Sequence, residues 1–252
     1  MPVLLPHDHF TFNAKTKIQD ITSSFLHTHQ FNYFQYLRCY IDGSVGLLTN
    51  ETGLLELFQH IDNQPVIFSS YTEEHQKVSS FWFLWDEELP DMPVQMAREK
   101  FNLRNGITYV RRTQFYYDMI AVTTAFDPMN GGSFYLNKIK AIEQFINDFD
   151  VEHQDLLALM DKNPILLPEP YRDCNYDRLC LTQGKIDVQG KTGLTHITAQ
   201  ELACLRGLLQ GLSYKNTAKR LHLSPRTVET YIQRIKARTG FANLTELERL
   251  LY

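Results

Sequence analysis

The sequence lacks long apolar runs and is poor in cysteine. No stretch approaches the roughly 18 consecutive apolar residues that a membrane-spanning helix needs, so we expect no membrane segment. The first ten residues, MPVLLPHDHF, carry no basic flank, and we expect no signal peptide there. The four cysteines suit a reducing compartment, and Cys39 and Cys204 lie inside apolar runs, which is typical of buried thiols. These features predict a cytoplasmic protein.

Motifs of known catalytic and metal sites are also missing. The sequence contains no GxSxG elbow, no phosphate-binding loop and no HExxH pair. Cys174 and Cys180 have five residues between them, which is too loose for the usual zinc spacing, so reduced thiols are favoured over a metal site or a regulatory disulfide. His7 and His9 flank Asp8, but this cluster has no third ligand. We therefore expect no enzyme activity, no metal and no cofactor.

The net charge of −4 hides an uneven distribution. Residues 194–252 contain nine basic and four acidic residues, whereas the rest of the chain contains 16 basic and 25 acidic ones. A basic tail on an acidic body is typical of a nucleic-acid-binding module attached to a domain that does not bind nucleic acid. Between the two, the stretch 164–193 has three prolines, three glycines and no sustained helical period. This pattern predicts a first domain over 1–168, a linker over 169–193 and a second domain over 194–252.

The first predicted domain alternates between helical and extended patterns. Helical spacing of apolar residues occurs in four stretches: 18–25, 54–61, 92–101 and 136–160. Aromatic and β-branched runs predict strands in three stretches: 31–50, which turns at Asp42-Gly43, 106–113 and 115–126. Helices that flank antiparallel strands form an α-β-α sandwich. The predicted fold class is therefore α+β, with an α-β-α sandwich followed by an all-α domain.

Four helices are predicted after residue 197, each with its own start signal. The capping box Thr198-Ala-Gln-Glu201 opens the first helix, and Ser224-Pro225 opens the third with an N-cap followed by proline at the first helical position. The other start and stop residues are the N-caps Ser213 and Asn243 and the left-handed stops Gly211 and Gly240. Only a three-residue turn separates the second helix from the third.

The third helix, 225–239, has one apolar side and one polar side. At about 100° per residue, Val228, Ile232 and Ile235 fall together and must face the core. A helix inserted into a DNA groove needs hydrogen-bonding side chains at its centre to read base edges, and cations at its margins to meet phosphates. The opposite side of this helix has that composition. Two helices joined by a short turn, the second with a polar and basic outer side, predict a helix-turn-helix. The alternative is a small helical bundle with a solvated basic face.

Residues 197–240, ITAQELACLRGLLQGLSYKNTAKRLHLSPRTVETYIQRIKARTG, resemble the DNA-binding domain of LuxR-type transcription regulators. That family carries the pattern LTxRE, then GxSxKEIA, then LxIS, then TVxxHxxxIxxKLG. The matching positions here are Thr198, Glu201, Leu205, Gly211, Ser213, Lys215, Ala218, Leu221, Leu223, Ser224, Thr227, Val228, Ile235 and Gly240. The resemblance implies a four-helix domain that docks its third helix in the major groove of double-stranded DNA. It also implies dimerisation through the fourth helix, where Leu247, Leu250 and Leu251 form a leucine face.

The resemblance and the helical phase together predict the DNA contacts. These are Ser213, Lys215, Ser224, Arg226, Thr227, Glu229, Thr230, Gln233, Arg234 and Lys236. Base-reading positions of relatives correspond to Glu229, Thr230 and Gln233, and a glutamate can accept a hydrogen bond from a cytosine amino group. Four departures from the pattern are Gln200 for the usual arginine, Asn216-Thr217 for Glu-Ile, His222 for the turn glycine and Tyr231 for the histidine of the third helix. The operator sequence is therefore left open.

Two segments of the first domain, 31–50 and 100–127, resemble the autoinducer-binding domain of quorum-sensing LuxR-type regulators. The long predicted helix that follows occupies the place of that family's dimer helix. Relatives that bind acyl-homoserine lactones use a tryptophan, a tyrosine and an aspartate shortly after the second strand, and here only Asp62 follows it. By family position, Tyr36 and Phe58 are predicted to contact a small apolar signal molecule. Other aromatic residues line a pocket for such a ligand or, as we favour for most of them, fill the core.

Two hypotheses about function follow. The favoured one is a homodimeric, DNA-binding transcription regulator in the bacterial cytoplasm, associated with the nucleoid, whose sensory domain answers an unknown signal or none. The second is a regulator that binds a protein partner through a helix-turn-helix that no longer reads DNA, and Glu229 is its best support. A phosphoryl-receiver domain is excluded because its acidic pair, aspartate and lysine do not occur in the required order.

Overall fold

The computed structural model describes residues 5–58, 78–89, 91–113, 115–128, 131–166 and 184–251. The chain forms two compact units, one built mainly from residues up to Asp173 and the other mainly from Cys174 onward. Each unit is considered by itself. None of the helices in the described ranges is long and apolar enough to cross a membrane.

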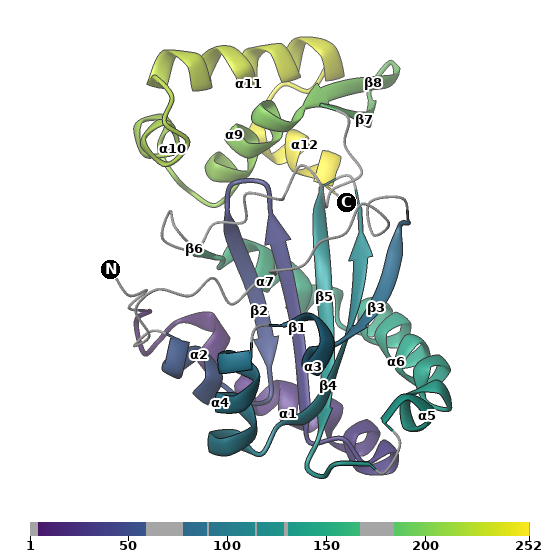
Figure 1. Ribbon diagram of the computed structural model, residues 1–252. Coiled ribbons are helices and arrows are strands. Elements are labelled where there is room, and N and C mark those ends of the chain that lie inside the picture. The colour runs from purple at the N-terminus through teal and green to yellow at the C-terminus, as the bar shows by residue number, and fades with distance from the viewer. Residues whose placement is uncertain are drawn as a thin grey trace. The chain divides into compact units, whose positions relative to one another are not determined.

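The first unit contains a six-stranded sheet with the strand order β3-β4-β5-β1-β2-β6 (Figure 1). Its strands are β1 (Tyr33–Tyr40), β2 (Ser44–Thr49), β3 (Ser80–Leu84), β4 (Arg104–Arg112), β5 (Tyr116–Thr124) and β6 (Ile165–Leu166). Strands β1 and β2 pair antiparallel, as β3 pairs with β4 and β2 with β6. The predicted turn between β1 and β2 is present, and Gly43 takes a positive φ of 75° that a glycine adopts without steric cost.

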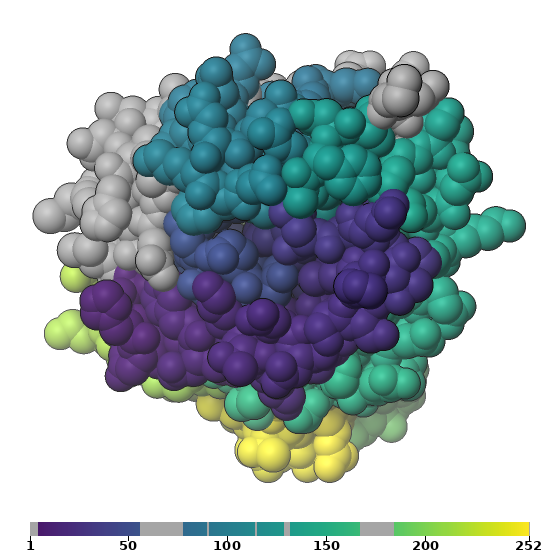
Figure 2. All heavy atoms as spheres, turned by 90° about the horizontal axis from the view of Figure 1, so that it is seen from below, coloured from purple at the N-terminus to yellow at the C-terminus, as the bar shows by residue number. Residues whose placement is uncertain are grey.

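Helices lie on both faces of this sheet, which confirms the predicted α-β-α arrangement. They are α1 (Phe10–His29), α2 (Gly53–Phe58), α3 (Trp85–Glu88), α4 (Asp91–Phe101), α5 (Gly131–Leu136), α6 (Ile139–Glu152) and α7 (Gln154–Lys162). On one face, α1, α6 and α7 bury Ile18, Ile142 and Met160 against Tyr36 and Ile120 of the sheet. Figure 2 shows α1, in purple, lying across the surface of this unit.

On the other face of the sheet, Trp85 of α3 contacts two strands. Its indole Nε1 donates a hydrogen bond to Thr108 Oγ1 at 2.8 Å, and its ring packs edge-on against Tyr33 at 6.2 Å between centroids. A Cβ atom at Gly106 would lie 2.1 Å from Trp85 Cδ2, so only glycine fits beneath this ring. These aromatic residues fill the core, as favoured from the sequence.

One long helix was predicted over 136–160, and the structure corrects this to two helices. Helix α6 ends at Glu152, and His153 leaves helical geometry with φ −122° and ψ 35° before α7 begins. Of the five residues that helical spacing places on the buried side, Ile142, Ile146 and Phe149 are almost completely buried, and Ile139 and Phe145 are half-buried. Apolar spacing continues across the break through Leu156 and Met160, which is why periodicity predicts a single helix.

The second unit combines a two-stranded hairpin with four helices. Its elements are β7 (Lys185–Gly190), β8 (Gly193–Thr198), α9 (Ala199–Leu209), α10 (Tyr214–Arg220), α11 (Pro225–Thr239), α12 (Leu244–Glu248) and a closing 3₁₀ turn (Arg249–Leu251). Its core contains Ile186, Val188, Ile197, Leu202, Leu205, Val228, Ile232, Ile235, Leu247 and Leu250. The four predicted helices are present at the predicted places.

Strand β7 corrects part of the predicted linker. Residues 169–183 lie outside the described residues, but 185–193 forms a strand and a tight turn rather than a connection. Ile186 and Val188 are buried while Asp187 and Gln189 are exposed, which is the alternation of a strand with one face on a core. Only two apolar residues show this alternation, and the neighbouring glycines favour a loop in the sequence.

The hairpin turn closes the C-terminal end of α11. The backbone N–H of Lys191 donates to the carbonyl oxygen of Thr239 at 2.8 Å, which satisfies one of the last free carbonyls of that helix. Gly190 packs directly against the same residue, because a Cβ atom there would lie 2.9 Å from the Thr239 oxygen and 3.0 Å from its Cα. The hairpin is therefore a structural part of the helical domain.

Gly190→Ala should destabilise the second unit by about 1–3 kcal/mol, because the added methyl group forces the turn away from the end of α11. Both tryptophans, Trp82 and Trp85, belong to the first unit, so their fluorescence follows that unit alone. In urea unfolding, the helical circular dichroism should shift while the tryptophan transition stays in place. The exposed neighbour Asp187→Ala serves as control, and an unchanged dichroism transition in Gly190→Ala would contradict the packing role.

Candidate nucleic-acid interface

Helices α10 and α11 are placed by local capping contacts. The Ser213 hydroxyl accepts from the N–H of Asn216 at 3.2 Å, and the Ser224 hydroxyl accepts from the N–H of Thr227 at 3.0 Å. Between the helices, His222 takes the left-handed conformation with φ 54°, at the position where the LuxR-type pattern has glycine. Histidine adopts this conformation more readily than most residues. The predicted helix-turn-helix geometry is confirmed.

The rotation of α11 about its axis is fixed by its apolar side. Val228, Ile232 and Ile235 are at most 2% exposed and belong to the core of the domain. The side that faces away from this core carries a polar strip, which we define as Arg226, Glu229, Thr230 and Gln233. Because one helix face is anchored, the side chains of the polar strip must point outward.

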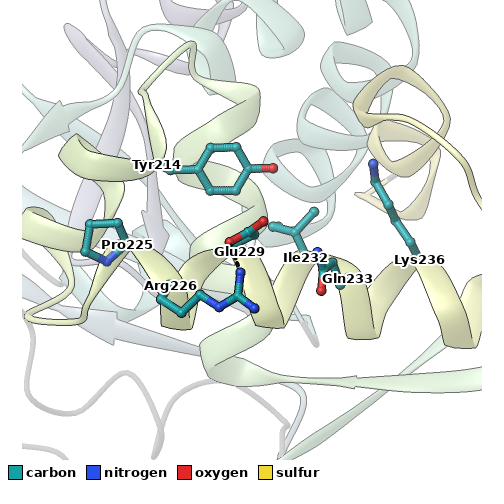
Figure 3. A pocket seen from close by; sticks show the side chains of 7 residues that line it. All are labelled: Tyr214, Pro225, Arg226, Glu229, Ile232, Gln233 and Lys236. Atoms are coloured by element: carbon teal, nitrogen blue, oxygen red, sulfur yellow. Dashed lines mark hydrogen bonds and ion pairs between the residues drawn. The ribbon is translucent and has the colours of Figure 1, made fainter.

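The polar strip borders a shallow hollow of about 460 Å³ (Figure 3). Its lining residues are Tyr214, Pro225, Arg226, Glu229, Ile232, Gln233 and Lys236. Tyr214 is the first residue of α10, it is 40% exposed, and sequence reasoning missed it. Its place directly after the N-cap Ser213 could have indicated in the sequence that it lies at the exposed start of the second helix.

Two interactions order the polar strip. The Arg226 guanidinium forms an ion pair with Glu229, with 2.8 Å between Nη1 and Oε2 (Figure 3). The Thr230 hydroxyl donates to the carbonyl oxygen of Arg226 at 2.8 Å, as hydroxyls in helices commonly do. Gln233 is exposed one turn further along the helix, so the strip presents charged and neutral hydrogen-bonding groups in sequence.

All ten residues predicted to contact DNA lie at exposed or half-exposed positions of α10, α11 and their caps. Lys215 on α10 and Arg234 on α11 provide exposed cations beside the polar strip, and Lys236 is half-buried at its edge. The hydroxyls of Ser213 and Ser224 also serve as helix caps. Contact of these residues with DNA stays a prediction.

Two contacts join α9 to α11. The Tyr231 hydroxyl donates to Gln200 Oε1 at 3.0 Å, and Arg238 forms an ion pair with Glu201. The Arg234 guanidinium lies 5.8 Å from the centroid of the Tyr231 ring. Tyr231 therefore contacts both the first helix of the domain and a cation predicted to meet phosphate.

Two of the three leucines expected to form a dimer surface are buried in their own domain. Leu247 is fully buried and Leu250 is 6% exposed, because both pack into the core of their own domain. Leu251 is half-buried and packs against the same core. These leucines complete the fold of the domain and do not form a free surface for a partner.

Tyr36, one of the two residues predicted to contact a signal molecule, is fully buried in a polar network. Its hydroxyl lies 2.6 Å from Arg111 Nη2, 2.9 Å from Asp118 Oδ2 and 3.1 Å from Asp150 Oδ1. Arg38 adds a fourth contact at 3.1 Å. The hydroxyl is thus surrounded by protein groups, and contact of Tyr36 with a signal molecule stays a prediction. The side chains of Phe58, Asp62, Cys174 and Cys180 lie outside the described side chains.

The network around Tyr36 joins the sheet to two helices through charged groups. Asp118 is completely buried, and its carboxylate receives hydrogen bonds from Arg38 Nε at 2.7 Å and Arg111 Nη2 at 2.7 Å. Arg38 also reaches Asp161 of α7 at 3.3 Å, and Arg111 pairs with Asp150 of α6. Burial alone would raise the pKa of Asp118, but the two arginines outweigh it and hold that pKa below its usual range.

One residue of the His7-Asp8-His9 cluster has a structural role at the start of a helix. His9 is the N-cap of α1, and its Nδ1 accepts a hydrogen bond from the N–H of Thr11 at 3.2 Å. Burial lowers the pKa of His9 despite the nearby charge of Asp8. Within the described ranges, no group of three or more histidine, cysteine, aspartate or glutamate residues is arranged to hold a metal ion.

Comparison with known proteins identifies the second unit. Residues 195–251 match the family described as "Bacterial regulatory proteins, luxR family", so this segment is a LuxR-family helix-turn-helix domain. No curated protein matches the chain. A solved structure of SdiA in complex with octanoyl-rac-glycerol is 14% identical, with a TM-score of 0.38, covering 93% of this chain and 85% of that one. A crystal structure of Escherichia coli SdiA is 12% identical, with a TM-score of 0.37, covering 93% of this chain and 91% of that one.

Asp118→Asn should destabilise the first unit by about 3–5 kcal/mol at neutral pH, because Arg38 and Arg111 lose a buried counter-charge. The folded-state pKa of Asp118 is depressed, so its contribution to stability is present above the unfolded pKa near 4 and is lost as the pH falls through the folded value. The variant should therefore lose part of the wild-type acid sensitivity below about pH 4. Tryptophan fluorescence in urea at several pH values measures both effects.

Asp127→Asn is the matched control for this measurement. Asp127 also pairs with an arginine, at 2.7 Å from Arg104, but its side chain is 54% exposed. Exposed ion pairs contribute about 0–1 kcal/mol, so this substitution should change little. Equal effects of the two substitutions would show that burial of the network around Tyr36 does not matter.

Proposed function

We propose that this protein, whose residues 195–251 form a LuxR-family helix-turn-helix domain, is a transcription regulator that binds double-stranded DNA through α11. One observation carries the proposal. Val228, Ile232 and Ile235 anchor one side of α11 in the core, and the opposite side presents the polar strip outward. A groove-inserted helix requires an anchored apolar side and an exposed hydrogen-bonding side of this kind.

The surrounding cations suit contact with the phosphate backbone. Lys215 on α10 and Arg234 on α11 are both exposed. Cations that neutralise phosphates supply affinity without sequence information, whereas hydrogen bonds to base edges supply the specificity. In the proposed complex, the basic residues position the domain and the polar strip reads the base pairs.

The proposed active form is a homodimer on a roughly palindromic site. Two copies of the helix-turn-helix would read half-sites about one helical turn apart, as two-fold symmetric regulators do. Because Leu247 and Leu250 are used inside the domain, the dimer contacts are proposed to come from the first unit. The exposure of Val151 on α6 and Leu159 on α7 is compatible with that role.

The first unit is proposed to sense a small apolar signal, or to act as an orphan domain without one. It would work in the bacterial cytoplasm at the nucleoid, without enzyme activity and without a cofactor. A crystal structure of the first unit grown without added ligand separates these possibilities. An enclosed pocket with unexplained density supports a sensor, and a filled core supports an orphan regulator.

A second candidate function is docking of a protein partner on the same helix. Glu229 favours it, because a carboxylate on a helix that faces DNA is repelled by phosphates unless it is bound by a donor. Mobility shifts with genomic fragments, compared with capture of protein partners, distinguish the two functions. Retention of duplex DNA at physiological salt supports the regulator.

Lys215→Ala and Arg234→Ala should each weaken binding to every duplex to a similar degree, because each removes one phosphate contact. The slope of log affinity against log salt should fall by about 0.9 for each. Gln233→Ala and Thr230→Ala should instead change the sequence preference. Fluorescence anisotropy over a salt series measures these effects, with the exposed Lys140→Ala on α6 as a charge-matched control. Unchanged DNA retention in the variant that lacks Arg226, Lys215 and Arg234 together would overturn the proposed function.

A further inference from the structure

The most unusual group on the polar strip is the carboxylate of Glu229. It lies at the edge of the outward side of α11, and its side chain is 44% exposed next to the hollow lined by Tyr214 and Gln233. In a helix that faces nucleic acid, a negative charge is repelled by the phosphates on both sides of the groove. Glu229 therefore needs a specific compensation if α11 binds DNA.

Part of the positive charge that Glu229 needs comes from a neighbouring arginine of the same helix. Arg226 lies one turn before Glu229, and its Nη1 is 2.8 Å from Glu229 Oε2 (Figure 3). The Arg226 side chain is 80% exposed, so the pair is formed on the surface and not buried against the domain. This contact places a positive charge next to the carboxylate in the free protein.

Glu229 also needs a hydrogen-bond donor on the DNA, and the base edges differ in whether they offer one. In the major groove, cytosine presents only an amino donor, whereas adenine presents an amino donor beside the N7 acceptor. Guanine presents two acceptors, and thymine presents an acceptor and a methyl group. A carboxylate accepts but does not donate, so the N7 and carbonyl acceptors repel it and the cytosine amino group alone suits it.

Arg226 extends this selection to a guanine. Its planar guanidinium has five donors, and the contact with Glu229 uses one nitrogen, which leaves donors for the O6 and N7 acceptors of guanine. Residues three apart in a helix are separated by about 4.5 Å along its axis, close to the spacing of stacked bases of about 3.4 Å. The two side chains are thus spaced to meet neighbouring base pairs.

From this geometry we propose that Glu229, paired with Arg226, is a specificity-determining residue that selects a C·G base pair in each half-site by accepting a hydrogen bond from the cytosine amino group. The inference rests on the proposed function, since it names the sequence that the DNA-binding helix selects. It assigns Glu229 to DNA and not to a protein partner.

The test is selection of binding sites from a library of random duplexes by the full-length protein. Wild type should enrich a motif with one C·G pair per half-site that Glu229→Ala no longer selects, while the other positions of the motif stay. Glu229→Gln should replace that pair with A·T, because an amide offers the donor and acceptor that match adenine. Glu248→Gln, which removes a negative charge from α12 of the same domain, is the matched control and should select the wild-type motif.

A direct measurement follows on the selected site. Exchange of the C·G pair for A·T should lower wild-type affinity roughly tenfold or more and leave the affinity of Glu229→Ala unchanged. Both variants alter an exposed side chain, and circular dichroism checks that their helices are intact.

The two possible failures are separable. If Glu229→Ala selects the wild-type motif with the same discrimination at every position, or if wild type selects no motif, the inference is overturned while DNA binding stands. If wild type retains no duplex at all, the proposed function fails, and the inference fails with it.

Discussion

Burial of Val228, Ile232 and Ile235 is the constraint on which the surface chemistry of the second unit depends. A rotation of α11 by one residue position would turn its side chains by about 100° and would carry a different set to the surface. The three side chains pack against elements on several sides, including Leu202 of α9 and Leu247 of α12. Because the anchor comes from the whole domain, the orientation of the polar strip does not depend on DNA. The orientation that the proposed binding requires is therefore already present in the protein without DNA.

Local signals explain why most of this domain could be predicted from the sequence. Each helix starts at a side-chain cap that acts within three residues, as Thr198 does with Glu201, and the left-handed turns at Gly211 and Gly240 fall where glycine permits them. Such signals are complete within a short stretch of chain. Strand β7 is the exception, because its role comes from Gly190 meeting Thr239, a residue distant in sequence. The hairpin therefore had the local composition of a linker although it belongs to the folded domain.

The polar network of the first unit shows the opposite case. Arg38 and Asp118 are 80 positions apart, and Arg38 and Asp161 are 123 apart, so no local pattern connects them. Family position predicts Tyr36 as a ligand contact, but gives no sign that its hydroxyl joins this network through Asp150 of α6. The break at His153 was hidden for a related reason, since the apolar spacing of the two helices continues through it.

Two departures from the LuxR-type pattern meet in the folded domain, and their chemistry fits. Gln200, in place of the usual arginine, lies on α9, and Tyr231, in place of the usual histidine, lies on α11, where its hydroxyl donates to the glutamine at 3.0 Å. An amide oxygen accepts the proton of a phenol, a role that a guanidinium cannot take because it has only donors. The Tyr231 ring also lies beside Arg234, so the exchange extends from the helix–helix contact to a cation at the predicted DNA surface. A change within the scaffold thus reaches the side chains that would meet DNA, and for this reason the pattern predicts how α11 folds but not which sequence it selects.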